Sequence, residues 1–106
     1  MFARIFEYKF TNLDQAKIAA NHCSMELGDK IDKFNIQSLS ITIGKCASLS
    51  IVAKIENNSD LQQFEKYASN LIDQLRKTAT FREGGFPGVM IFNYEGEAAL
   101  EAIDLS

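Results

Sequence analysis

Two side chains near the start of the sequence, Arg4 and His22, have chemistry that could bind a small ligand. Arg4 stands between Phe2 and Phe6 in a run of alternating aromatic residues. A guanidinium there can hold an anionic group or pair with an acid across a dimer, or its stem can cover apolar surface while its head reaches water. His22 is the only histidine, and without a titratable partner nearby in the sequence it is more typical of a helix surface than of a general base. Both are candidate ligand-binding residues.

A row of hydroxyl side chains accompanies the clearest alternating pattern in the chain. Ser38, Ser40 and Thr42 alternate with aliphatic residues, and Ser50 lies in the next alternating segment. Inside a closed cavity such a row could orient a ligand by hydrogen bonds. On an open sheet it is the solvated face. We take Ser40 and Thr42 as further candidate ligand-binding residues and leave both interpretations open.

The other reactive residues form no recognisable catalytic or metal site. Cys23 and Cys46 make no CxxC motif, and two thiols alone do not hold zinc, so we predict reduced cysteines and no metal. Glu97 and Glu101 have helical spacing, but nothing in the sequence distinguishes them from a solvated helix face. The sequence therefore predicts no cofactor and leaves the catalytic residues unknown.

The segment 81–88, Phe-Arg-Glu-Gly-Gly-Phe-Pro-Gly, has the composition of a loop. It lacks the lysine and hydroxyl residue of a phosphate-binding loop. It could be a mobile lid, but we favour a connecting loop whose Phe81 and Phe86 pack on neighbouring residues.

Length and composition indicate one globular domain over 1–106. The chain is 46% hydrophobic and 24% charged, with a net charge of −3. This mild negative charge does not favour nucleic acid, and the alternating segment 49–55 lacks the aromatic residues of RNA-recognition strands. Charges interrupt the N-terminal segment too early for a secretory signal, and no apolar run approaches the ~20 residues of a membrane span. We expect a cytoplasmic protein that binds neither nucleic acid nor membrane.

Hydrophobic periodicity predicts the elements that position these residues. A strand over 2–10 precedes a helix that is capped by Thr11 or Asn12 and ends at Gly28 or as late as Phe34. A hairpin follows, with strands over 38–43 and 49–55.

The second half of the chain repeats the helix–strand pattern. Ser59 and Gln62 make a capping box for a second helix that ends near 78–80. After the glycine-rich loop we expect a last strand over 89–94 and a short helix over 97–103.

The order of these elements, β-α-β-β-α-β, predicts a ferredoxin-like α+β fold. Right-handed crossovers place both helices on one face of a four-stranded antiparallel sheet. Aromatic and aliphatic residues on both faces of the outer segments would leave an apolar surface of several hundred Å² uncovered, which monomers rarely expose. We therefore predict a homodimer whose interface includes Phe2, Phe6, Phe86 and Phe92, or the residues that share a face with them.

This arrangement resembles the dimeric α+β barrel superfamily, which includes cofactor-independent monooxygenases of antibiotic biosynthesis. The resemblance rests on element order, on Phe6-Glu7-Tyr8-Lys9-Phe10 before a capped helix, and on Ile51–Ile55 followed by Ser59-Asp60-Leu61. It implies two sheets paired around a central barrel and, in many members, a small molecule held between sheet and helices. Haem-degrading members use a histidine and a tryptophan. Because this chain has no tryptophan and its histidine is on the first helix, we do not carry that chemistry over.

Two function classes remain. The first is a homodimeric module that binds a small apolar or amphipathic molecule or associates with itself. The alternative is a cofactor-independent, monooxygenase-like enzyme acting on a small apolar or aromatic substrate. The second requires a polar group converging on an apolar pocket, which only Arg4, His22 and the hydroxyl row could supply. We favour the first class, because it needs no special residues and the sequence shows none.

Overall fold

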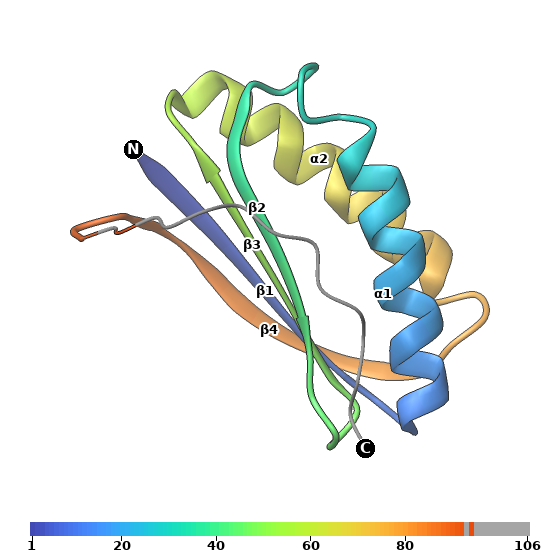
Figure 1. The fold of residues 1–106 in the computed structure, drawn as a ribbon. Helices are drawn as coiled ribbons and strands as arrows, with labels where there is room; N and C mark the ends of the chain where they lie inside the picture. Colours follow the sequence, from blue (N-terminus) through green and yellow to red (C-terminus); the bar gives the residue numbers. More distant parts are fainter. Residues whose placement is uncertain (93, 95–106) are drawn as a thin grey trace.

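The computed structural model describes residues 1–92 and 94. Its elements are β1 (Phe2–Phe10), α1 (Leu13–Gly28), β2 (Ile36–Ile43), β3 (Ser48–Ile55), α2 (Asn58–Leu75) and β4 (Phe81–Val89). The strands form one sheet in the order β2-β3-β1-β4, and every neighbouring pair is antiparallel. Figure 1 shows α1 and α2 on the same side of this sheet. The predicted ferredoxin-like fold is confirmed.

Asparagine side chains begin both helices. Asn12 Oδ1 accepts a hydrogen bond from the Gln15 N–H at 2.9 Å, so one of the two predicted caps of α1 is correct. Asn57 Oδ1 accepts from the Asp60 N–H at 2.8 Å, and α2 begins at the next residue. The capping box predicted at Ser59 is therefore wrong, because the asparagine two residues earlier already satisfies the free amide of the first turn.

The helix ends differ from the predictions in one case. Of the two ends considered for α1, the structure has the earlier, Gly28. Phe34 lies in the turn that follows and is buried, with its ring 6.1 Å from that of Phe64. The second helix ends at Leu75, three residues before the predicted range.

The aromatic side chains of β1 point toward the helices and form the core. Phe6, Tyr8 and Phe10 are buried, and the Phe6 ring lies 6.1 Å from that of Phe64 on α2. Phe2 is half-buried against the same core. Aromatic pairs of this kind add to the free energy of area burial. Phe6 and Phe2 thus lie on the helix side of the sheet, and their place at a dimer interface stays a prediction.

The last strand is not where the sequence analysis placed it. The predicted strand over 89–94 and loop over 81–88 are wrong, because β4 spans Phe81–Val89 and pairs with β1 along its whole length. Pro87 is tolerated because β4 is an edge strand, where one side of the backbone needs no ladder hydrogen bond. Gly85 has φ +115°. A Cβ at this position would lie 2.0 Å from the Ile5 carbonyl oxygen, so the glycine marks a close backbone approach rather than a loop.

After β4 the chain continues beside its own N-terminus. Met90 N–H donates to the Met1 carbonyl at 3.2 Å. Phe92 follows and is 83% exposed. The short helix predicted over 97–103, with Glu97 and Glu101, lies outside the described residues.

Candidate functional site

A cleft of about 480 Å³ lies between α2 and the paired strands β1 and β4. We call it the Arg4 cleft. Alternation along β1 places Arg4, Phe6 and Tyr8 on its floor, since residues two apart share a face of a strand. The helix contributes a stripe of residues three and four apart, and the glycines of β4 leave the rim open. The lining consists of Arg4, Phe6, Tyr8, Glu65, Ser69, Ile72, Asp73, Arg76, Glu83, Gly84 and Gly85.

Two ion pairs span the Arg4 cleft. Arg4 Nε lies 3.2 Å from Glu65 Oε2, which ties β1 to α2. Arg76 Nη2 lies 2.6 Å from Glu83 Oε2, which ties α2 to β4. The Arg76–Glu83 pair is exposed, and such pairs stabilise a fold by only ~0–1 kcal/mol. The main effect of the two pairs is therefore to shape the cleft.

The Arg4 side chain contacts three other residues of the same chain. Besides Glu65, its Nη1 donates to the Ile5 carbonyl at 2.7 Å, and its guanidinium carbon lies 4.3 Å from the centre of the Phe6 ring. Neither of the alternatives from the sequence describes it fully. The stem does not simply extend to water, and an anionic ligand would have to compete with Glu65 for the guanidinium.

Tyr8 lies at the floor of the Arg4 cleft and was not singled out from the sequence. Its side chain is buried, and burial followed by the carboxylate of Glu83 raises the pKa of Tyr8 far above its usual range. The raised pKa keeps the phenol protonated well into the alkaline range, so it can donate a hydrogen bond. A signal for it existed, because Tyr8 continues the period-two pattern that includes Arg4.

The charge of the Arg4 cleft favours neutral or cationic ligands. Three carboxylates, those of Glu65, Asp73 and Glu83, line it together with two guanidiniums. Asp73 forms no ion pair with any other residue that the structure describes. A ligand that brings a cation or a neutral hydrogen-bond donor would balance the excess negative charge.

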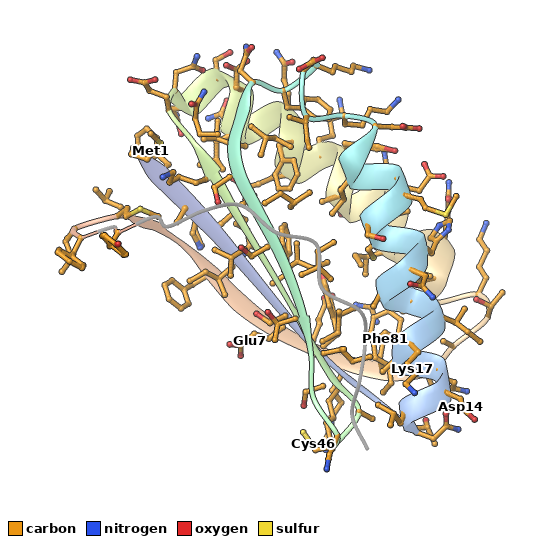
Figure 2. All side chains as sticks on the ribbon, in the orientation of Figure 1. Met1, Glu7, Asp14, Lys17, Cys46 and Phe81 are labelled. Carbon is orange, nitrogen blue, oxygen red and sulfur yellow. The ribbon has the colours of Figure 1, made fainter. Side chains whose placement is uncertain are left out.

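The other face of the sheet carries a second candidate surface, the open sheet face. Register places Ile5 opposite Val52 on one side and Phe86 on the other, on the face away from the helices. Phe86 is 57% exposed. Figure 2 shows Glu7 pointing away from the helices, whereas Phe81 lies on the helix side. The open sheet face thus has an apolar centre next to charged and polar ends.

The hydroxyl row lies on this open sheet face. Ser40 is paired with Val52 and Thr42 with Ser50. Thr42 and Ser50 also line a shallow hollow of about 590 Å³ that includes Glu7, Lys9 and Arg82. Ser40 does not line that hollow.

The structure does not bring the four candidate ligand-binding residues together. Arg4 lines the cleft under α2, whereas Ser40 and Thr42 lie on the opposite face of the sheet. His22 is on α1, half-buried, and is not part of the Arg4 cleft. Among the described residues no group of three or more metal-ligating side chains occurs. Neither helix in this part of the chain is long and apolar enough to cross a membrane.

No protein-family model matches the chain, and no curated protein matches it. Solved structures do. A dimeric ferredoxin-like protein from an uncultured marine organism matches with a TM-score of 0.67 at 13% identity, over 90% of this chain and 98% of the other. A candidate antibiotic biosynthesis monooxygenase from Deinococcus radiodurans matches with a TM-score of 0.67 at 10% identity, over 91% of this chain and all of the other.

A third match is a de novo designed protein with a ferredoxin fold, with a TM-score of 0.55 at 16% identity and 96% of both chains covered. At these identities the three matches show the fold alone. The chain has the ferredoxin-like fold and resembles the dimeric α+β barrel proteins at the level of the fold.

Proposed function

We propose that this chain is a homodimeric module that binds a small amphipathic molecule in the Arg4 cleft. The observation that carries the proposal is the convergence of five charged side chains, those of Arg4, Glu65, Asp73, Arg76 and Glu83, on a cleft beside the Tyr8 phenol. Phe6, Tyr8 and Ile72 line the cleft as largely buried side chains, and the protonated Tyr8 hydroxyl can donate a hydrogen bond to a ligand. A volume of about 480 Å³ is in the range of small-molecule sites, and the lining of this cleft is mostly polar and charged.

The ligand of this module has an aromatic or aliphatic body and a neutral or cationic polar end. The body packs on Phe6 and Ile72, and the polar end meets the excess carboxylates, of which Asp73 has no described ion-pair partner. Binding needs no displacement of Arg4 from Glu65. This differs from the anionic ligand that the position of Arg4 in the sequence suggests.

The dimer brings together two copies of the open sheet face. Ile5, Val52 and Phe86 form its apolar centre, and a partner presenting the same residues would cover them. The similarity to a dimeric ferredoxin-like protein supports this pairing. A cytoplasmic location stays a prediction.

A matched series of three phenols tests the ligand class. Tyramine, 4-ethylphenol and 3-(4-hydroxyphenyl)propionate share one ring and differ in the charge of the side chain. Titrated against the labelled protein in amide NMR spectra, tyramine should bind tightest and the propionate weakest, with shifts around Tyr8 and Asp73. Asp73→Asn should weaken tyramine binding roughly two- to fivefold, as expected for one partly exposed charge pair.

Asp14→Asn removes the same charge at the start of α1 and should leave tyramine binding unchanged. The proposal fails if the propionate binds tightest or if the two variants weaken tyramine equally.

The alternative function is a cofactor-independent monooxygenase, and the similarity in fold to a candidate antibiotic biosynthesis monooxygenase favours it. Its pocket would be the same cleft, with Tyr8 as a hydrogen-bond donor to the substrate. An oxygen electrode distinguishes the two. Steady consumption of dioxygen with any of the three phenols, lost in Tyr8→Phe, would support the enzyme over the binding module.

A further inference from the structure

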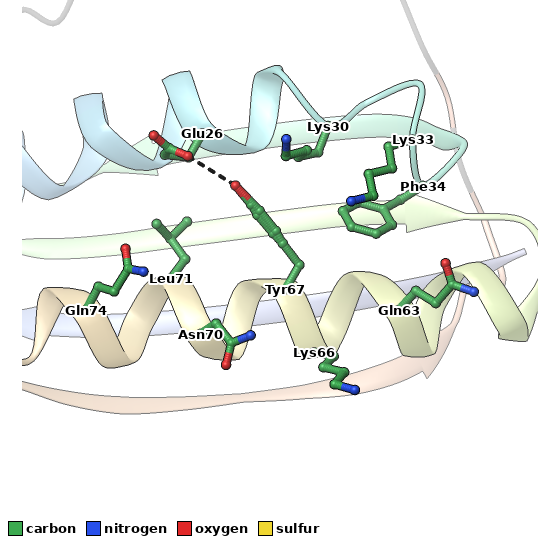
Figure 3. Close-up of a pocket in the computed structure, with 10 residues that line it drawn as sticks. All are labelled: Glu26, Lys30, Lys33, Phe34, Gln63, Lys66, Tyr67, Asn70, Leu71 and Gln74. Atoms are coloured by element: carbon green, nitrogen blue, oxygen red, sulfur yellow. Dashed lines mark hydrogen bonds between the residues drawn. The ribbon is translucent and has the colours of Figure 1, made fainter.

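A second groove lies on the opposite flank of α2 from the Arg4 cleft. It runs between α2 and the end of α1 with the turn that follows, and its volume is about 490 Å³ (Figure 3). We call it the interhelical groove. Its side chains come from positions such as Lys66, Tyr67 and Asn70, whereas the Arg4 cleft uses Glu65, Ser69 and Asp73. The two sites therefore share a helix but no residue.

The interhelical groove is basic although the chain as a whole carries a net charge of −3. Lys30, Lys33 and Lys66 line it, and Glu26 is its one lining carboxylate among the described residues. None of the three lysines forms an ion pair with a residue that the structure describes. Asp29 and Asp32 belong to the same turn but do not line the groove.

Aromatic rings form the walls next to these lysines. Lys30 Nζ lies 5.6 Å from the centre of the Tyr67 ring, and Lys33 Nζ lies 5.6 Å from that of Phe34. Such contacts hold an ammonium beside an apolar surface at a modest gain of ~0.5–1 kcal/mol. The lysines are therefore placed where a ligand could meet an apolar wall and a positive charge together.

Glu26 is already engaged. Its Oε2 accepts a hydrogen bond from the Tyr67 hydroxyl at 3.1 Å, shown dashed in Figure 3. This bond joins the two helices across the groove. The carboxylate is thus turned toward Tyr67, and the ammonium groups of Lys30 and Lys33 beside the aromatic rings make this part of the groove positive.

We propose that the interhelical groove binds a small organic anion with a flat apolar body. The body packs against the Tyr67 ring and Leu71, and the anionic group lies beside Lys30 and Lys33. The amides of Asn70 and Gln74 add donors along α2. This ligand carries a negative charge, whereas the ligand proposed for the Arg4 cleft has a neutral or cationic polar end.

The test uses naphthalene-2-sulfonate and its neutral counterpart naphthalene-2-methanol, each titrated into the whole chain and followed by amide NMR. The sulfonate should shift residues 26–34 and 63–74 and bind at least fivefold tighter than the alcohol. Lys30→Gln with Lys33→Gln should weaken the sulfonate roughly five- to twentyfold, as expected for two charge contacts in a partly covered site. Glu26→Gln should tighten it, because a nearby negative charge is removed.

Lys9→Gln with Lys17→Gln is the matched control. It lowers the total charge by the same amount on β1 and at the start of α1, away from the groove, and should leave sulfonate binding unchanged. Equal binding of the sulfonate and the alcohol would overturn the proposal, and so would equal weakening by the two lysine pairs. Neither result bears on the Arg4 cleft, whose lining contains none of these residues.

Discussion

Neighbouring glycines in β4 have different backbone requirements. Gly84 has no atom within 4 Å of where a Cβ would lie, and nothing in its conformation excludes another residue. Gly85 combines φ +115° with a Cβ position 2.0 Å from the Ile5 carbonyl oxygen. Only Gly85 is therefore required by the pairing of β4 with β1.

Gly85→Ala should lower the free energy of unfolding by about 2 kcal/mol or more, because both backbone strain and the clash with β1 must be relieved. Gly84→Ala should change it by less than about 1 kcal/mol, in either direction. Urea unfolding followed by circular dichroism measures both. Equal losses of unfolding free energy in the two variants would mean that the backbone conformation and close contact of Gly85 do not make it more sensitive to substitution than Gly84.

The two cysteines should differ sharply in reactivity. Burial raises the pKa of the Cys23 thiol to about 11, whereas a hydrogen bond with Ser48 lowers the pKa of Cys46 on the exposed turn. Since the thiolate is the reactive form, iodoacetamide at pH 8 should add one group, at Cys46. Mass spectrometry of the native protein and of Cys46→Ser checks this. The serine variant should stay unmodified until urea exposes Cys23, and early modification of Cys23 would contradict the buried position.

At the scale of elements, α2 is the helix on which most of the described chemistry depends. One flank closes the Arg4 cleft and the other lines the interhelical groove, while its apolar stripe of Leu61, Phe64 and Leu71 packs into the core. Because three sides of α2 make contacts, the residue at which the helix begins determines which side chains lie on each side. A shift of one residue would rotate every side chain by about 100°.

Asn57→Ala should therefore destabilise the protein by ~1 kcal/mol, through loss of the hydrogen bond from the Asp60 amide. Ser59→Ala is the matched variant at the cap that the sequence predicted, and it should cost less than about 0.5 kcal/mol. Chemical unfolding of the two single variants decides between the caps. A larger loss in Ser59→Ala would restore the original prediction.

Most of the fold could be predicted from the sequence because periodicity is a local signal. The strand over 2–10 and the hairpin over 38–55 are visible in alternating residues alone. β4 was missed because Gly84, Gly85 and Pro87 oppose strand formation locally, and only pairing with β1 makes the segment extended.

The candidate site was harder to predict than the fold for a related reason. Arg4 was found because it interrupts an aromatic pattern. Glu65, Asp73 and Arg76 belong to a helix face that looks solvated in sequence, and their role depends on how α2 lies against β1 and β4. Distances between elements are not encoded in spacing along the chain.

At the scale of the whole molecule, the open sheet face predicts the assembly state. Phe86 is exposed there, next to Ile5 and Val52 of the neighbouring strands, so its burial should come from a second copy. An interface that covers this face should bury more than ~1,000 Å² in total, the size that specific interfaces reach.

Sedimentation equilibrium should give twice the chain mass of 11.9 kDa for the unmodified protein. Phe86→Glu should shift the equilibrium toward the single chain, because a charge would be buried between the sheets. Ile18→Glu places the same charge on an exposed isoleucine of α1 and should leave the dimer intact. A single 11.9 kDa species of the unmodified protein at all concentrations would refute the dimer.

The sheet order has a consequence for how the protein is made. β1 is the first strand to be synthesised, yet one of its two partners, β4, is the last, and the pairing runs from Phe2 with Val89 to Phe10 with Phe81. At ~5–20 residues per second, translation leaves β1 without that partner for roughly 4–15 seconds. During this interval β3 can already pair with β1, so a growing chain presents a three-stranded sheet whose free edge is its most aromatic strand. Among the four strands, closure of that edge by β4 thus comes last, and until then the free edge of β1 is open to pairing with other chains.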